Sequence, residues 1–163
     1  MNIKTIALLA ITLSAQAEAV ELRMSNGLLI LEKASIMEAE YNGNEYSTLK
    51  KYNGKNLMVT GKVRSITVNS ITGKPAIVLT TGIMKSVMFS ADRIDDKTLE
   101  YLRAGNNVVI MCNKAKLTSS IFLHIKGCNI VVRLNDKTKP TLLNHFITNN
   151  ESKEAQIKAA LFL

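Results

Sequence analysis

Between Tyr52 and Ile130, short apolar runs alternate hydrophobic and polar side chains. This pattern predicts half-buried antiparallel strands. The clearest run is 57–64, whose two faces are predicted to be an apolar inner face (Leu57, Val59, Gly61, Val63) and a polar outer face (Met58, Thr60, Lys62, Arg64). Gly61 in the middle of this run predicts a bulge or a sharp bend, which a small barrel needs where one strand serves both halves.

Further strands are expected at 76–81, 85–90, 107–113 and 121–133, with a short helix at 97–103. Asp95 or Asp96 is a suitable N-cap for this helix, and Gly105 a suitable C-terminal glycine. Five strands with a helix between the third and fourth are typical of the OB-fold, a partly open Greek-key barrel. We therefore expect a mainly β protein, a five-stranded OB-fold Greek-key barrel with an N-terminal helix and a short helix between strands three and four.

The first 19 residues match a secretory signal peptide. Lys4 precedes the apolar run 5–14, and small residues at 15–17 and 17–19 form A-x-A sites. We expect cleavage after Ala17 or Ala19 and a periplasmic or secreted protein. The apolar run is shorter than the 20 or so residues that a membrane span needs.

The remaining chain divides by composition. Residues 20–55 are predicted to be an N-terminal helical segment that packs on the barrel, because helical spacing starts at Leu31. The barrel is expected to occupy 56–134. Residues 135–163 are predicted to be a polar linker and a C-terminal tail. We expect the tail to fray, since an isolated helix of that length is marginal in water. The alternative is a short helix whose apolar end docks on the barrel or on a partner.

Export affects the interpretation of the two cysteines. In an oxidising compartment, two cysteines of a small domain usually form a disulfide, so Cys112 and Cys128 are expected to pair. The alternative is two buried, unpaired thiols. A metal site is not expected, because two cysteines and two histidines, His124 and His145, do not make a ligand cluster.

The formal charge of +8 favours acidic partners without choosing among them, and an ordinary basic surface is the simplest interpretation. Nucleophile-elbow, zinc-protease, P-loop and dinucleotide motifs are absent from the sequence, so we expect no enzyme and no cofactor. His124 alternates with Phe122 and Lys126 and is predicted to face solvent. Aromatic residues make up 5% of the chain, which is few for a base-stacking surface.

Four short motifs resemble one protein family. These are Tyr41-Asn42-Gly43-Asn44-Glu45, Tyr52-Asn53-Gly54-Lys55, Val59-Thr60-Gly61-Lys62-Val63 and Gly127-Cys128-Asn129-Ile130. Over residues 38–131 the chain resembles the tRNA_anti-like family of bacterial OB-fold proteins, many of which are exported proteins or lipoproteins. The resemblance implies an OB-fold and export. It implies no catalytic residue, and the family name reflects a fold rather than contact with tRNA.

OB barrels bind ligands on the face of strands two and three and on the flanking loops. This predicts a ligand-binding surface formed by Lys62, Arg64, Lys74, Lys85, Met88 and Phe89. The expected function is an exported binding module of unknown ligand that recognises a protein or an envelope glycan in the periplasm. The expected partner is an unknown protein or an anionic component of the envelope. The alternative is a periplasmic inhibitor or regulatory factor that docks through its surface or its C-terminal tail. Nucleic acid binding has weaker support.

Overall fold

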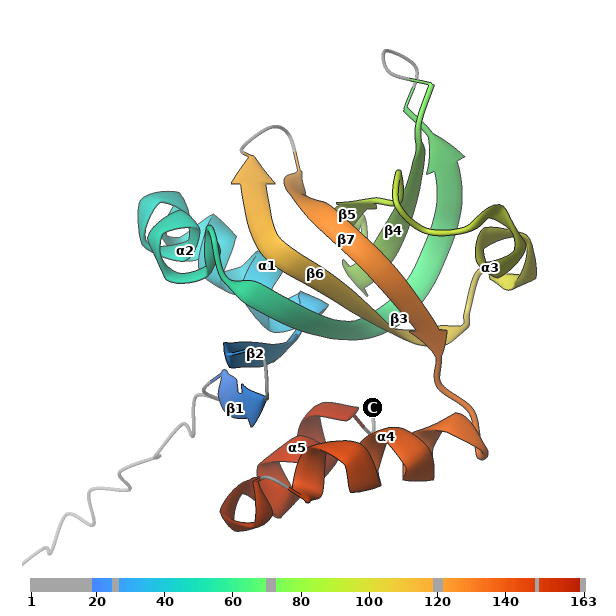
Figure 1. Cartoon of the computed structure of the whole chain (residues 1–163). Coiled ribbons are helices and arrows are strands. Elements are labelled where there is room, and N and C mark those ends of the chain that lie inside the picture. Colours follow the sequence, from blue (N-terminus) through green and yellow to red (C-terminus); the bar gives the residue numbers. More distant parts are fainter. Residues whose placement is uncertain (1–18, 25–26, 70–72, 119–121, 149, 162–163) are drawn as a thin grey trace, which may run out of the picture.

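Five strands form a closed ring in the computed structural model, which describes residues 19–24, 27–69, 73–118, 122–148 and 150–161 (Figure 1). The strands are β3 (Asn56–Val68), β4 (Pro75–Gly82), β5 (Lys85–Ser90), β6 (Asn107–Thr118) and β7 (Leu123–Arg133). Their order is β3-β4-β5-β7-β6, and β6 pairs back with β3 to close the ring. Helix α3 (Asp96–Tyr101) lies between the third and fourth of these strands. This connectivity is that of the OB-fold, so the predicted fold is confirmed.

Strand β3 serves both halves of the ring. Its first half pairs with β6, from Leu57 to Lys62, and its second half pairs with β4, from Lys62 to Val68. The register irregularity that bends it lies after Val63, slightly beyond the predicted position at Gly61. Gly61 instead permits a close approach, because a Cβ there would lie 2.9 Å from Leu79 Cδ1.

The segment before the barrel begins with strands, which corrects the helical prediction for residues 20–33. β1 (Val20–Met24) and β2 (Gly27–Lys33) form a hairpin, and β2 pairs in parallel with the start of β3. The physical reason is that β4 leaves the first half of one edge of β3 unpaired. An apolar run can satisfy its own backbone hydrogen bonds by pairing with such an edge. Helices α1 (Ala34–Gly43) and α2 (Glu45–Tyr52) follow.

The barrel core is continuous with α1 and with the end of α2. Ala34, Met37 and Tyr52 are buried in the same cluster as the inward-facing residues of the five strands. Cys112 and Cys128 also belong to this cluster and form a disulfide bond, as predicted for an exported protein. Asp95, one of the two predicted caps, accepts a hydrogen bond from the Thr98 amide at the start of α3.

The C-terminal segment folds against the outside of the sheet, so the prediction of a fraying tail is wrong. Helices α4 (Thr138–Ile147) and α5 (Glu154–Leu161) follow, with a 3-10 turn (Glu151–Lys153) between them. Helix α5 lies beside β1 and β2, and α4 packs against α5 (Figure 1). They complete a second apolar cluster with Leu22, Leu31 and Met58. A helix that is marginal alone is stabilised by such packing.

Thr60 is part of the same contact. It was predicted to lie on a polar outer face, but it is fully buried, and its hydroxyl donates a 2.9 Å hydrogen bond to the Ala160 carbonyl. Helix α5 therefore turns the outer face of β3 into an interior surface. In the part of the chain that the structure describes, no helix has the length and apolar character needed to cross a membrane.

Candidate functional site

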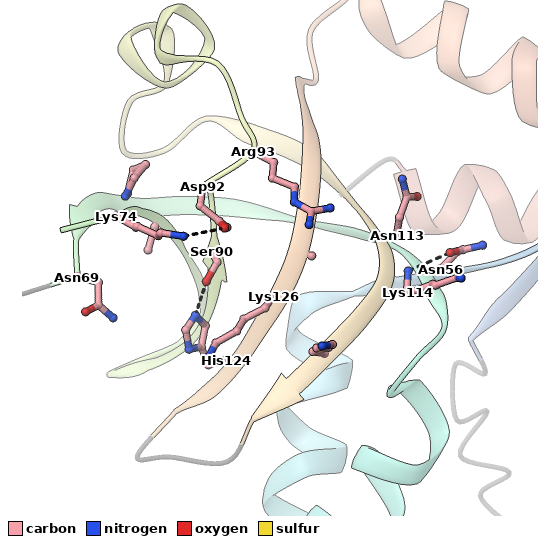
Figure 2. A pocket seen from close by; sticks show the side chains of 14 residues that line it. Asn56, Asn69, Lys74, Ser90, Asp92, Arg93, Asn113, Lys114, His124 and Lys126 are labelled. Atoms are coloured by element: carbon pink, nitrogen blue, oxygen red, sulfur yellow. Dashed lines mark hydrogen bonds and ion pairs between the residues drawn. The ribbon is translucent and has the colours of Figure 1, made fainter. Parts of the chain in front are cut away.

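A concave surface on the outside of the barrel encloses a cavity of about 740 Å³ (Figure 2). Its position follows from the alternation of β7, in which Leu123 and Ile125 enter the core while His124 and Lys126 point outward. The end of β5, the segment after it and the middle of β6 supply most of the other walls. The lining residues are Asn56, Asn69, Lys74, Pro75, Ala76, Ser90, Asp92, Arg93, Asn113, Lys114, Lys116, His124, Lys126 and Gly127.

The concave surface is strongly basic. Its lining includes five cationic side chains, from Lys74, Arg93, Lys114, Lys116 and Lys126. Asp92 is the single carboxylate among these lining residues, and it forms a 3.4 Å ion pair with Lys74. Lys116 and Lys126 lie directly opposite each other in the β6–β7 ladder. Like charges in this position destabilise a sheet, so a bound anion would relieve the repulsion.

His124 points outward from β7, as predicted, but it is half-buried within this surface. Its Nε2 atom and Ser90 Oγ share a 2.8 Å hydrogen bond (Figure 2). Burial lowers the pKa of the imidazole, and the nearby charge of Lys126 lowers it further. The ring is therefore held in its neutral form at neutral pH.

A bulge in β6 forms one wall. Between the pairs Cys112–Cys128 and Lys116–Lys126, β6 has three residues, 113–115, whereas β7 has only Gly127. Gly127 has a φ of +88°, and a Cβ at this position would lie 3.0 Å from the Asn113 carbonyl oxygen. Glycine is required here both for the backbone conformation and for the space. The bulge carries Asn113 and Lys114 into the concave surface.

The turn at 53–56 holds this bulge in place. The Gly54 amide donates to the Ala115 carbonyl, and the Ala115 amide donates to the Lys55 carbonyl, each over 2.7 Å. The Asn56 side chain accepts from the Lys114 amide over 3.0 Å. The Tyr-Asn-Gly-Lys motif and the Gly-Cys motif therefore meet at one structural feature, the β6 bulge and its supports.

Of the predicted site residues, only Lys74 lines the concave surface. Lys62 and Arg64 are exposed on β3 outside it. Lys85 lines a smaller cavity of about 200 Å³ next to α1. Met88 is half-buried opposite His124 in the β5–β7 ladder but does not line the larger cavity.

Phe89 cannot contact a ligand, which corrects the prediction. It is fully buried and pairs with Ile77 and Ile125, so the register of β5 directs it into the core. Sequence reasoning missed Arg93, Lys114, Lys116 and Lys126. The alternation Leu-His-Ile-Lys in residues 123–126 was the signal that could have indicated β7 as a binding face. In the described ranges, no group of three or more His, Cys, Asp or Glu residues is arranged to hold a metal ion.

The closed five-stranded ring, with its helix between the third and fourth strands, defines an OB-fold protein. A family comparison agrees, because the tRNA_anti-like family matches residues 7–129. The chain belongs to the tRNA_anti-like family. A sequence comparison with curated proteins gives no match.

Solved structures with a similar arrangement include a lipoprotein from Klebsiella pneumoniae subsp. pneumoniae, named for nucleic acid binding. It is 14% identical, with a TM-score of 0.48, and the match covers 64% of this chain and 91% of that one. An OBody bound to hen egg-white lysozyme is 17% identical, with a TM-score of 0.39, and the match covers 52% of this chain and 86% of that one. The Stn1-Ten1 complex of S. pombe is 17% identical, with a TM-score of 0.37, and the match covers 64% of this chain and 75% of that one. Because the similarity to these structures is low, the assignment of the OB-fold rests on the strand order and on the family match.

Proposed function

We propose that this protein is an exported OB-fold binding module that holds an anionic ligand in the basic concave surface. The observation that carries the proposal is the grouping of five cationic side chains around one concave surface, with one carboxylate that is already ion-paired. A concave, low-dielectric surface of one charge sign concentrates opposite charges and speeds their association.

The opposed pair of Lys116 and Lys126 supports a role of these charges in ligand binding rather than in solubility alone. Solubility requires dispersed charge, and two lysines directly opposite each other reduce stability. A bound anion between them would remove this cost and gain charge-assisted hydrogen bonds.

A periplasmic or extracellular location is part of the proposal. Residues 1–18 of the predicted signal peptide lie outside the described residues. The support from structure is the buried disulfide Cys112–Cys128. Disulfides persist in oxidising compartments and are rare in the cytosol.

We favour binding over catalysis. The hydrogen bond between Ser90 and His124 has the geometry of a nucleophile and its base. A catalytic pair also needs a third group that orients the base. Asp92, the carboxylate of the concave lining, is instead engaged with Lys74.

The test compares two triple variants with the same change in net charge. Lys114, Lys116 and Lys126 are changed to Gln in one, and the exposed lysines Lys50, Lys97 and Lys137 are changed to Gln in the other. We expect the first variant to bind polygalacturonate at least ~10-fold more weakly than the unchanged protein, because each lost charge contact contributes about 1 kcal/mol. The second variant should bind within about twofold. Equal losses in the two variants would show that overall charge acts without a site.

A protein partner is the second candidate, as for an inhibitor or regulatory factor. The observation in its favour is the β4–β5 turn, where Ile83 is 92% exposed and Met84 is 83% exposed. The C-terminal helices offer less support, because their apolar residues pack on the protein's own sheet. A pull-down from periplasmic extract at low and high salt tests this candidate. One protein recovered at both salts, and lost from an Ile83→Ser/Met84→Ser variant, would support it.

A further inference from the structure

Among the described residues that line the concave surface there is no Phe, Tyr or Trp. The one aromatic ring is the imidazole of His124, which is half-buried and hydrogen-bonded to Ser90. The chain has four Tyr, four Phe and no Trp. Tyr52, Phe89 and Phe146 are fully buried. Tyr41 and Phe122 line the smaller cavity near α1, while Tyr46 and Tyr101 are exposed on α2 and α3. The remaining aromatic residue, Phe162, lies outside the described residues.

The loops whose placement is not described do not change this inventory. Residues 70–72 are Ser-Ile-Thr and residues 119–121 are Ser-Ser-Ile. Neither loop can supply an aromatic ring to the site.

This lack of rings bears on the chemistry of the ligand. Proteins that bind single-stranded nucleic acids stack successive bases on aromatic side chains, and each stacked base contributes about 5- to 150-fold in affinity. The described lining offers no Phe, Tyr or Trp ring, and its one imidazole, that of His124, is half-buried and hydrogen-bonded to Ser90. It can contact the phosphates of a nucleic acid but has little means to hold the bases, apart from the planar guanidinium of Arg93 and the half-buried imidazole of His124.

The groups that line the site suit a different polymer. The carboxamides of Asn56, Asn69 and Asn113 and the hydroxyl of Ser90 occur among the cations. Carboxamides and hydroxyls both donate and accept hydrogen bonds, as sugar hydroxyls do. The fork of Arg93 matches a carboxylate or a phosphate.

We propose that the ligand is an anionic saccharide chain, a hydroxyl-rich polymer with carboxylate or phosphate groups that is recognised without ring stacking. This inference rests on the proposed function and adds the class of ligand to it.

Direct binding of the purified protein to five probes tests the inference. The probes are oligogalacturonate (carboxylate), phosphorylated mannan (phosphate), neutral dextran, a thymidine 15-mer and an abasic deoxyribose-phosphate 15-mer. We expect one or both anionic glycans to bind and neutral dextran to bind at least ~10-fold more weakly. The tighter of the two anionic glycans identifies carboxylate or phosphate as the preferred group. The thymidine and abasic oligomers should bind within about twofold of each other, since bases add nothing without stacking.

A variant separates hydrogen bonding to hydroxyls from charge. Asn113→Ala should weaken glycan binding about fivefold, the usual effect of one lost hydrogen bond, and should leave the abasic oligomer unaffected. Thymidine binding that exceeds abasic binding by ~10-fold would overturn the glycan assignment while leaving the anion site intact. Equal binding of dextran and the anionic glycans would also overturn it. If none of the anionic probes binds, the proposed function itself fails.

Discussion

Gly127→Ala tests whether the β6 bulge depends on a close backbone approach. Gly127 has a φ of +88°, and a Cβ there would lie 3.0 Å from the Asn113 carbonyl oxygen. The change therefore imposes two costs, an unfavourable backbone conformation and a steric conflict with backbone that cannot rotate away.

Gly105→Ala is the matched control. Gly105 has a φ of +87°, but no heavy atom lies within 4 Å of its added Cβ. It therefore carries the conformational cost, about 1–2 kcal/mol, without the steric one. Gly127→Ala should cost a further 1–3 kcal/mol or so, the usual range for overpacking.

Urea unfolding followed by circular dichroism measures both variants. A difference of about 2 kcal/mol corresponds to roughly 1 M in the midpoint for a protein of this size. Because the bulge carries Asn113 and Lys114, Gly127→Ala should also weaken polygalacturonate binding, whereas Gly105→Ala should not. If the two variants lose equal stability within about 0.5 kcal/mol, the close approach at Gly127 does not hold the bulge and the reasoning is refuted.

The other predictions concern the disulfide, the C-terminal helices and two titratable groups. Replacement of Cys112 and Cys128 by Ser should cost about 3 kcal/mol in urea unfolding, the chain-entropy value for a loop of this size, and thiol titration of the unreduced, denatured protein should find no free thiol. Phe146→Ala should cost about 3 kcal/mol or more and expose α4 and α5 to protease; unchanged cleavage would mean that their packing contributes little. Glu32 is buried and its pKa is raised by burial above the usual 4.5, so its carboxylate costs stability as the pH rises. Glu32→Gln should therefore raise the Tm at pH 8 but not at pH 4, and an equal gain at both would contradict this. Burial lowers the pKa of His124 below the usual 6.5, and a bound anion favours the charged ring. Glycan affinity should therefore rise as the pH is lowered below 6.5, and His124→Gln should abolish this rise.

The candidate site was only partly accessible from the sequence. The general OB-fold rule directed attention to strands two and three. It selected Lys74, which lines the concave surface, but also Phe89, which is buried in the core. A single residue of register decides whether a strand side chain faces the core or solvent. The cations of the site come from β6, β7 and the segment after β5, which are separated in sequence and adjacent only after the ring closes.

The short motifs were visible in the sequence, but their purpose was not. Asn53 and Gly54 look like an ordinary turn that ends a helix. In the structure, the Asn53 side chain accepts from the Leu117 amide and the Gly54 amide donates to the Ala115 carbonyl. These contacts span about 60 positions of the chain, which no local pattern encodes.

From the sequence alone, the five barrel strands, the helix between the third and fourth strands, and the disulfide could be predicted. The reason is that period-two alternation, cap residues and the context of the cysteines are local properties of the sequence. The tertiary structure alone decided three further features. Residues 20–33 became strands because β3 had an unpaired edge, and the C-terminal helices became ordered because an apolar outer face was available to them. The basic concave surface formed because ring closure brings outward-facing residues of distant strands together. All three features depend on long-range contacts. The free energy of such contacts is set by residues that are distant in the sequence, so a local pattern does not predict it.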